Sequence, residues 1–313
     1  MGLVEAMHST IDHLRGWQRA LEHRLARFVA WRLVVRTAGE LRADDATHMA
    51  AGVAYYAVLS LFPLLLALIA GLSLALRSDT VEAELFDFFE TYLPGSVELL
   101  EKNITAAAPV RGAIGLLGLL GLLWSASAIF GAISRAVNRA WDVHRDRPFY
   151  VAKLRHLAMA AGVGILFILS LTITTALQTL GGVTLPGVGS LSFLENTVVS
   201  VGGRALPFLL SFAIFTLIYK FIPNTKTFWR YVWPGALLAA VLFELAKSVF
   251  ILYLDRFANY QAVYGSIGSV IALLVWMYLS AFVLILGAEF SSEYGRMREG
   301  VDPGTLIDPN LLD

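Results

Sequence analysis

The residues of this chain that could carry chemistry are a carboxylate and an ammonium group inside an otherwise apolar segment. In the segment 232–254, Glu244 and Lys247 are three positions apart, so in a helix both lie on one face and can neutralise each other. Ser248 is expected on the same face. A charged side chain at the centre of a bilayer costs about 2.5–3.5 kcal/mol and therefore faces a partner or water. Two interpretations stay open: an ion pair that holds neighbouring helices together, or a pair that lines a polar cavity and handles a substrate or protons.

Polar residues in other apolar segments could complete such a cavity. Tyr56 and Ser60 are four positions apart, and Pro63 in the same segment removes a backbone hydrogen bond. Glu289 ends the last apolar run, where it could pair with Arg135 or Arg139 for a functional or a structural purpose. Small and hydroxyl residues also pack helices together in membranes, which is the simpler explanation for any single polar stripe. Besides the pair, the candidate cavity residues are Ser248, Tyr56, Ser60, Pro63, Ser127, Asn138, Gln178, Tyr264 and Glu289.

The signatures of soluble catalytic sites are missing from the sequence. The chain has no cysteine, which excludes disulfides, thiolate metal sites and cysteine nucleophiles. None of its six histidines stands at metal-ligand spacing from another histidine or a carboxylate. A P-loop, a dinucleotide-binding glycine motif and a nucleophile elbow are also absent. We therefore expect no catalytic residues, no metal, no cofactor and no nucleic-acid partner.

The elements that must position the polar residues are long apolar runs. Hydrophobic residues make up 57% of the chain, charged residues 15%, and the mean hydropathy is +0.67, which is typical of membrane proteins. About 20 apolar residues suffice for a helix to cross a bilayer. The sequence thus predicts an all-α polytopic membrane protein with a transmembrane domain at 48–290. Its six spans are predicted at about 49–76, 112–134, 157–180, 204–222, 232–254 and 262–288.

The distribution of basic residues predicts the orientation of the spans. Most of the 24 Lys and Arg residues fall in the N-terminal tail 1–47, the loops after the second and fourth spans, and the C-terminal tail 291–313. Basic loops stay in the cytoplasm, so both termini are predicted to be cytoplasmic. The N-terminal tail also predicts a basic amphipathic helix, which lies either among lipid headgroups or under the bundle. An acidic loop at 77–111 and a Gly/Pro-rich loop at 181–190 are then external.

Several segments in order resemble the YihY/BrkB family of bacterial inner-membrane proteins. They are HMAAGVAYYAVLSLFPLLLALIAGL at 48–72, LLWSASAIFGAISRAVNRAWDV at 122–143, RPF at 147–149, LIYKFIPNTKTFWRYVWPGALLAAVLFELAK at 217–247 and YGSIGSVIALLVWMYLSAFVLILGAEF at 264–290. The resemblance implies six spans in the bacterial cytoplasmic membrane. The family was historically mislabelled ribonuclease BN, and some members are associated with serum resistance or envelope lipid export. It supplies no catalytic residues to carry over.

Three hypotheses of function follow from these observations. The first is a transporter or flippase-like exporter of a lipid or other amphiphile, with membrane lipids as partners and a polar intramembrane cavity as its path. The second is a non-transporting membrane scaffold whose Arg-rich faces recruit envelope partners or anionic lipid. The third, an enzyme such as a ribonuclease, has the least support because no catalytic arrangement is visible. The substrate, the direction and energy source of transport, and the oligomeric state stay open.

Overall fold

The computed structural model describes residues 29–75, 111–143, 147–181, 192–256 and 266–305. Within these ranges the chain forms seven helices and no strand, which confirms the predicted all-helical fold class. The helices are α2 (Val29–Ala43), α3 (Ala46–Ala75), α6 (Arg111–Ala140), α7 (Phe149–Gly181), α8 (Ser192–Phe221), α9 (Trp229–Arg256) and α11 (Ser266–Glu299).

The six helices from α3 to α11 correspond to the six apolar runs of the sequence. Each has between 28 and 34 residues and contains the described part of one predicted span, except that α8 ends one residue before the predicted span 204–222 does. Within the described ranges, three segments are long and apolar enough to cross a membrane: Phe149–Leu166, Trp229–Leu254 and Val270–Glu299. Crossing by all six helices, and cytoplasmic termini, stay predictions. The acidic loop 77–111 and the predicted amphipathic helix within residues 1–28 lie outside or almost outside the described residues.

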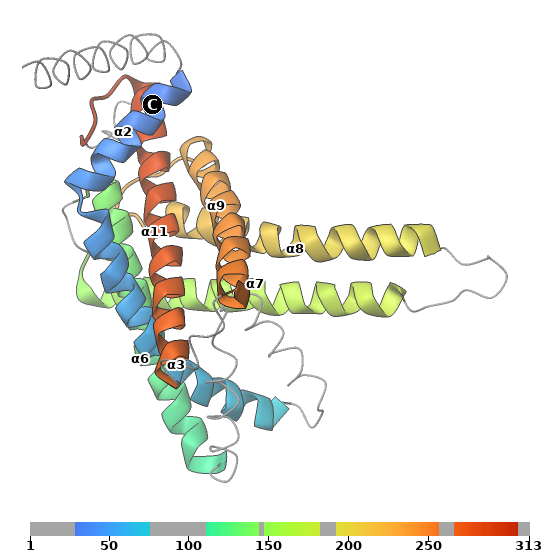
Figure 1. Ribbon diagram of the computed structural model, residues 1–313. Coiled ribbons are helices and arrows are strands. Elements are labelled where there is room, and N and C mark those ends of the chain that lie inside the picture. Colours follow the sequence, from blue (N-terminus) through green and yellow to red (C-terminus); the bar gives the residue numbers. More distant parts are fainter. Residues whose placement is uncertain (1–28, 76–110, 144–146, 182–191, 257–265, 306–313) are drawn as a thin grey trace, which may run out of the picture.

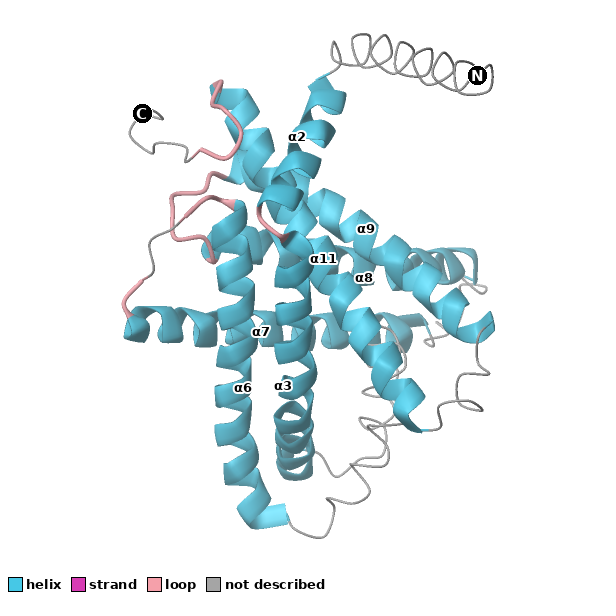
Figure 2. Ribbon diagram, turned by 60° about the vertical axis from the view of Figure 1, so that its left-hand side comes forward, coloured by secondary structure: helices cyan, strands magenta, loops and turns pink. Residues whose placement is uncertain are grey.

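The helices form two groups that cross each other. α3, α6 and α11 run side by side, and α2 packs along the end of α11 (Figures 1 and 2). α7 and α8 form an antiparallel pair that lies across these helices and extends beyond them (Figure 1). α9 connects the two groups, because it packs against both α8 and α11. The arrangement is therefore not a bundle of parallel helices.

Left-handed turns end two of the helices. After α6, Asp142 has a φ of 53°, and the N–H of Val143 donates to the carbonyl of Asn138 at 2.8 Å. After α11, Gly300 has a φ of 69°, and the N–H of Val301 donates to the carbonyl of Arg296 at 2.9 Å. Both are Schellman-type ends, which satisfy carbonyls that would otherwise lack a donor. They fix where the chain leaves each helix and so bring polar residues of the two ends together.

The core lies where α3, α6, α8, α9 and α11 meet, and small residues make up much of it. Buried alanines there include Ala46 and Ala50 of α3, Ala132, Ala136 and Ala140 of α6, and Ala236, Ala239 and Ala240 of α9. Glycine allows a still closer approach of α9 to α11. A Cβ atom on Gly287 would lie 2.7 Å from the Cβ of Ala239 and 2.9 Å from the carbonyl oxygen of Gly235. Small residues that let backbones approach closely are the usual contact between membrane helices.

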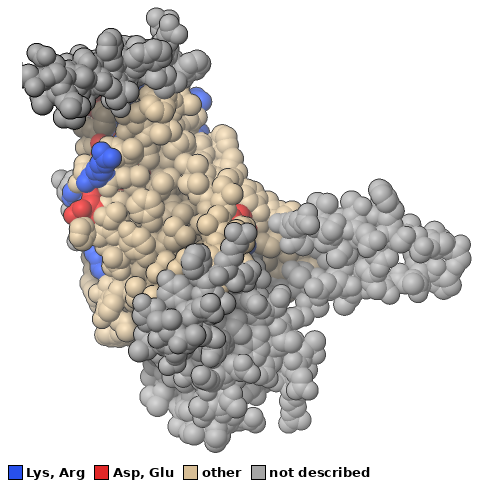
Figure 3. All heavy atoms as spheres, in the orientation of Figure 1, with Lys and Arg blue, Asp and Glu red and all other residues tan. Residues whose placement is uncertain are grey.

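The face formed by α9 and α11 is largely free of charged side chains (Figure 3). Apolar side chains are exposed on both helices, among them Leu237, Val241, Leu245 and Val249 of α9 and Leu274 and Val275 of α11. A continuous apolar surface of this kind is typical of a protein face that meets a membrane or a partner.

Candidate functional site

The predicted pair of charges inside the apolar segment of α9 does form. Lys247 Nζ lies 2.6 Å from Glu244 Oε2, and the two side chains are 10% and 26% exposed. Ser211 of the neighbouring helix α8 donates from its hydroxyl to Glu244 Oε1 at 3.3 Å. The pair therefore lies at the contact between α8 and α9 and interacts with both helices. Each oxygen of the Glu244 carboxyl therefore has one partner, Lys247 from its own helix and Ser211 from α8.

Lys247 is turned away from the exposed stripe of α9, and Glu244 lies at the edge of that stripe. Leu237, Val241, Leu245 and Val249 recur every four residues and form that stripe, while Lys247, two positions from the last two, lies nearly opposite. Ser248, one turn after Glu244, lies on the Glu244 side of the helix, and its place in a cavity stays a prediction. Ser248 is exposed, and its hydroxyl donates to the backbone carbonyl of Glu244 at 2.9 Å.

The other predicted cavity residues within the described ranges are distributed over α3, α6, α7 and α11. Ser60 is buried and donates to the carbonyl of Ala57 at 2.7 Å, and Ser127 is buried on α6. The ring of Tyr56 lies under the guanidinium of Arg135, with 5.9 Å between Cζ and the ring centroid. Pro63 and Gln178 belong to α3 and α7, but their side chains lie outside the described residues, as does Tyr264 as a whole. Gathering of these residues around Glu244 and Lys247 stays a prediction.

A small hollow between α3 and α11 is apolar rather than polar. It has a volume of about 160 Å³ and is lined by Ala51, Ala54, Tyr55, Leu274, Val275 and Tyr278. None of the predicted cavity residues whose side chains the structure describes lines it.

Asn138 anchors a loop. Its Oδ1 atom accepts a hydrogen bond from the backbone N–H of Asn224 at 2.7 Å, in the loop that joins α8 to α9. Its Nδ2 atom makes a longer contact of 3.4 Å with Ser134 Oγ on its own helix. The side chain therefore fixes the α8–α9 loop against α6.

Glu289 is fully buried, and its predicted pairing with Arg135 or Arg139 is wrong. Arg139 Nε instead lies 2.9 Å from Oδ1 of Asp44, which follows α2. Neither carboxyl oxygen of Glu289 has a hydrogen-bond partner among the described residues, and the carboxyl of Asp44 lies beside it. The position of Asp44 depends on the turn between α2 and α3, where Asp45 has a φ of 57°, and no periodicity of the sequence predicts it.

A buried network of charges near Glu289 escaped the sequence analysis. Arg36 Nε of α2 lies 2.6 Å from Glu293 Oε2 of α11, and the Glu293 side chain is fully buried. Arg296 is also buried and pairs with both Glu293 and Asp142. It further donates from Nε to the carbonyl of Thr305 at 2.8 Å. One feature of the sequence could have revealed this network. The spacing of Glu289, Glu293 and Arg296 places three ionisable residues on one face of α11.

The arrangement supplies charge in apolar surroundings, and no catalytic constellation is evident in it. In the ranges that the structure covers, His, Asp and Glu side chains do not gather in groups of three that could hold a metal ion. The pair on α9 can offer a carboxylate and an ammonium group to a polar or zwitterionic molecule. The buried network on α11, in contrast, has its charges engaged with one another and joins α2, α6 and α11.

Comparison with known proteins identifies relatives over most of the chain. The family described as Virulence factor BrkB matches residues 37–305. A Bacillus subtilis protein named as ribonuclease-like, YfkH, is 32% identical over 245 residues, which are 77% of this chain and 87% of the relative. A protein of Aeromonas salmonicida named UPF0761 membrane protein is 30% identical over 262 residues, which are 82% of this chain and 87% of the relative. Another UPF0761 membrane protein, of Pseudoalteromonas translucida, is 29% identical over 80% of this chain and 81% of its own length. No solved structure matches the chain.

Proposed function

This chain belongs to the BrkB family of membrane proteins, and we propose that it transports a lipid or another amphiphile across the bacterial inner membrane. The observation that carries the proposal is the Glu244–Lys247 pair, with Ser211 beside it, in the middle of a helix that is otherwise apolar. A structural pair between two helices needs no exposure, whereas Glu244 keeps 26% of its side chain accessible. An accessible charge in such a position supports contact with a polar group that passes it.

The surroundings of the pair suit an amphiphile. The exposed apolar stripe of α9 runs beside the pair, from Leu237 to Val249. Acyl chains stay in the bilayer along this stripe, while the polar head exchanges water for the carboxylate, ammonium and hydroxyl groups between α8 and α9. The cost of taking a polar head through hydrocarbon is the barrier to spontaneous lipid movement, and hydrogen-bonding groups at mid-membrane depth lower it.

Six membrane crossings with both termini in the cytoplasm form part of the proposal. The length of each of the six helices, at 28 residues or more, supports it. Because α7 and α8 lie across the other helices, their hairpin is the part of the chain whose crossing most needs a test.

The chain has no cysteine, so a single introduced cysteine is the only thiol that can react with a maleimide. Suitable positions are provided by Ser78→Cys, Ser190→Cys and Thr305→Cys. In right-side-out vesicles, an impermeant maleimide is expected to label the first two variants and not the third. Protection of the Ser190→Cys variant would mean that the α7–α8 hairpin does not cross.

The transport experiment uses the full chain in liposomes with fluorescent phospholipid analogues. We expect faster exchange between leaflets with the wild type, and the rate of protein-free liposomes with Glu244→Gln or Lys247→Met. Ile165→Ala, at an exposed apolar residue of α7 outside this stripe, is the matched control and keeps the wild-type rate. Wild-type exchange in both charge variants, from folded protein, would remove the pair from the mechanism.

A charge exchange separates a structural pair from a transporting one. Glu244→Lys combined with Lys247→Glu restores opposite charges at the same spacing, but Ser211 then meets an ammonium group instead of a carboxylate. A purely structural pair predicts that the double variant regains both stability and transport. The proposed role predicts that stability returns while transport does not.

Two other functions, a membrane scaffold and a ribonuclease, predict different experimental results. Absence of lipid movement under any ion gradient, together with reproducible capture of a partner in mild detergent, would favour a membrane scaffold. The name of the Bacillus subtilis relative points to ribonuclease activity. That activity would have to survive purification of this chain and disappear on substitution of His144 or His156.

A further inference from the structure

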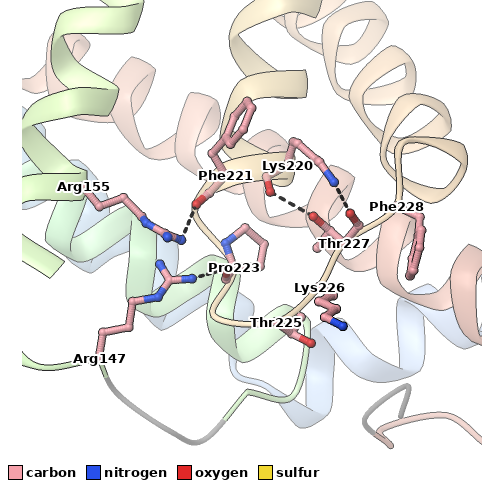
Figure 4. A pocket seen from close by; sticks show the side chains of 9 residues that line it. All are labelled: Arg147, Arg155, Lys220, Phe221, Pro223, Thr225, Lys226, Thr227 and Phe228. Atoms are coloured by element: carbon pink, nitrogen blue, oxygen red, sulfur yellow. Dashed lines mark hydrogen bonds between the residues drawn. The ribbon is translucent and has the colours of Figure 1, made fainter. Parts of the chain in front are cut away.

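A basic hollow lies where the α8–α9 loop meets the start of α7. It has a volume of about 420 Å³. Figure 4 shows Arg147 and Arg155 reaching the loop from the side of α7, while Lys220 and Lys226 belong to the end of α8 and to the loop itself. The lining residues are Arg147, Arg155, Lys220, Phe221, Pro223, Thr225, Lys226, Thr227 and Phe228. Four of them are cationic, and none of the described lining residues is acidic.

The loop that forms the hollow is held by hydrogen bonds at both ends. Thr227 Oγ1 donates to the carbonyl of Lys220 at 2.9 Å, and Lys220 Nζ donates back to the carbonyl of Thr227. Asn138 fixes the middle of the loop through the N–H of Asn224. The hollow is therefore a built feature of the fold.

Helix capping accounts for only part of the positive charge. Arg155 donates to the carbonyl of Phe221, the last residue of α8, at 2.9 Å, and Arg147 donates to the carbonyl of Pro223, two residues later, at 2.7 Å. Each guanidinium has five N–H groups, so both retain donors for a ligand. Lys226 takes no part in the cap: it is exposed and has no hydrogen bond or ion pair with the described residues.

The charges in the hollow repel one another. Burial and, after it, the positive charge of Arg155 lower the pKa of Arg147 from its ordinary value. Within the described part of the chain, none of the four cations forms an ion pair with an acidic residue. An anion in the hollow would relieve the repulsion and accept charge-assisted hydrogen bonds, and arginine forks match phosphate oxygens in particular.

Aromatic residues around the hollow indicate an amphiphile rather than a free anion. Trp229 is 56% exposed, contacts the ring of Phe221 and lies 5.4 Å from Lys220 Nζ. Phe149 and Tyr150, next to Arg147 in the chain, are also exposed. Two of the three segments apolar enough to cross a membrane, Phe149–Leu166 and Trp229–Leu254, begin here. Exposed aromatic and basic residues at the start of apolar helices are typical of the headgroup level of a membrane.

We propose that this basic hollow binds the phosphate group in the head of an amphiphile. The inference rests on the proposed transport function and specifies its substrate class: a phosphate-bearing lipid. The lining of the hollow ends at Phe228, directly before α9, and Glu244 lies about 22 Å along the axis of α9 from its first residue, Trp229. A headgroup held at Lys220 and Lys226 is therefore placed at one end of the helix that carries the mid-membrane pair.

Direct binding to the full chain in a neutral detergent tests the proposal without any transport. The probes for calorimetric titration are short-chain phosphatidic acid below its micelle concentration, the matching diacylglycerol, which lacks the phosphate, and inorganic phosphate. We expect phosphatidic acid to bind most tightly, with an affinity that falls as salt rises. Lys226→Met and Lys220→Met should each weaken it about tenfold or more, since each removes a charge-assisted contact. Arg298→Met removes an exposed charge outside the hollow and should leave the affinity unchanged.

Each alternative result overturns a stated part of the inference. Inorganic phosphate binding as tightly as phosphatidic acid would identify a free anion as the ligand. Equal binding of diacylglycerol, or full affinity in both lysine variants, would exclude phosphate recognition by the hollow. The proposed transport function is refuted by a different result. Binding of phosphatidic acid without lipid movement in liposomes would refute transport and support the binding site. Lipid movement without such binding would support transport and refute the binding site.

Discussion

Asn138 of α6 holds the backbone of Asn224, 86 residues further along the chain, through a 2.7 Å hydrogen bond from the N–H of Asn224 to Oδ1. The bond connects the α8–α9 loop to the helix group that crosses α7 and α8. Asn138→Ala leaves that N–H without its acceptor, which costs about 1–3 kcal/mol in a part-buried position. We expect a lower Tm in detergent, and an α8–α9 loop that is held less firmly where it forms the basic hollow. Ser134→Ala, which removes only the 3.4 Å contact of Asn138, should leave Tm nearly unchanged. An equal loss in both variants would contradict the anchoring role.

Arg296 joins two parts of the chain through buried ion pairs, and its removal should be severe. Arg296→Met leaves the carboxylates of Glu293 and Asp142 without this partner in a buried environment. Breaking a buried pair by removing one member costs about 3–5 kcal/mol. The check is the free energy of unfolding from denaturant titration. Arg298→Met, two residues away and exposed, should change it by no more than about 0.5 kcal/mol.

Gly287 lies at a close approach of α9 and α11. A methyl group there would meet the hydroxyl of Tyr219, which is itself fixed by a 2.7 Å bond to the carbonyl of Leu284. Since backbone and fixed side chains surround the position, Gly287→Ala should destabilise the protein by about 1–3 kcal/mol or more. Gly162→Ala is the matched control, because a Cβ on Gly162 of α7 meets nothing within 4 Å. It should be neutral or stabilise by about 0.5–1 kcal/mol. A Tm of Gly287→Ala at or above that of the wild type would show that the helices can separate freely.

Much of the fold could be predicted because composition and periodicity act within a segment. Apolar runs with few charges predict long helices, and six of them are found. The spacing of Glu244 and Lys247 on one helix predicts their pairing, which occurs at 2.6 Å. Ser248, four positions from Glu244, is exposed and donates to the backbone carbonyl of Glu244, and its expected place in a cavity stays a prediction.

Contacts between helices could not be predicted in the same way. Asn138 was expected to line a cavity, but its acceptor binds a backbone N–H in a distant loop. Arg36 and Arg296 counted only as charges that set the orientation of the chain, whereas both belong to a buried network with Glu293. Periodicity specifies which residues share a face of a helix. Which helix that face meets depends on packing over the whole chain, as the crossing of α7 and α8 over α3, α6 and α11 illustrates.

The same substitution at two glutamates of α11 should have opposite effects. Both oxygens of Glu289 and Oδ2 of Asp44 are buried without a hydrogen-bond partner among the described residues, although the two carboxyl groups are neighbours. The amide of Glu289→Gln supplies a donor to Asp44 Oδ2 and removes a buried acidic group, so this variant should be more stable by about 1–3 kcal/mol. Glu293, one turn later, accepts hydrogen bonds from Arg36 and Arg296. Glu293→Gln weakens both charge-assisted bonds and should lower stability by about 1.5–3 kcal/mol. Thermal unfolding of the two variants in the same detergent provides the comparison. A fall in Tm for Glu289→Gln of the size seen for Glu293→Gln would mean that the Glu289 carboxyl has a partner that its amide cannot replace, and the geometry beside Asp44 would have to be reassigned.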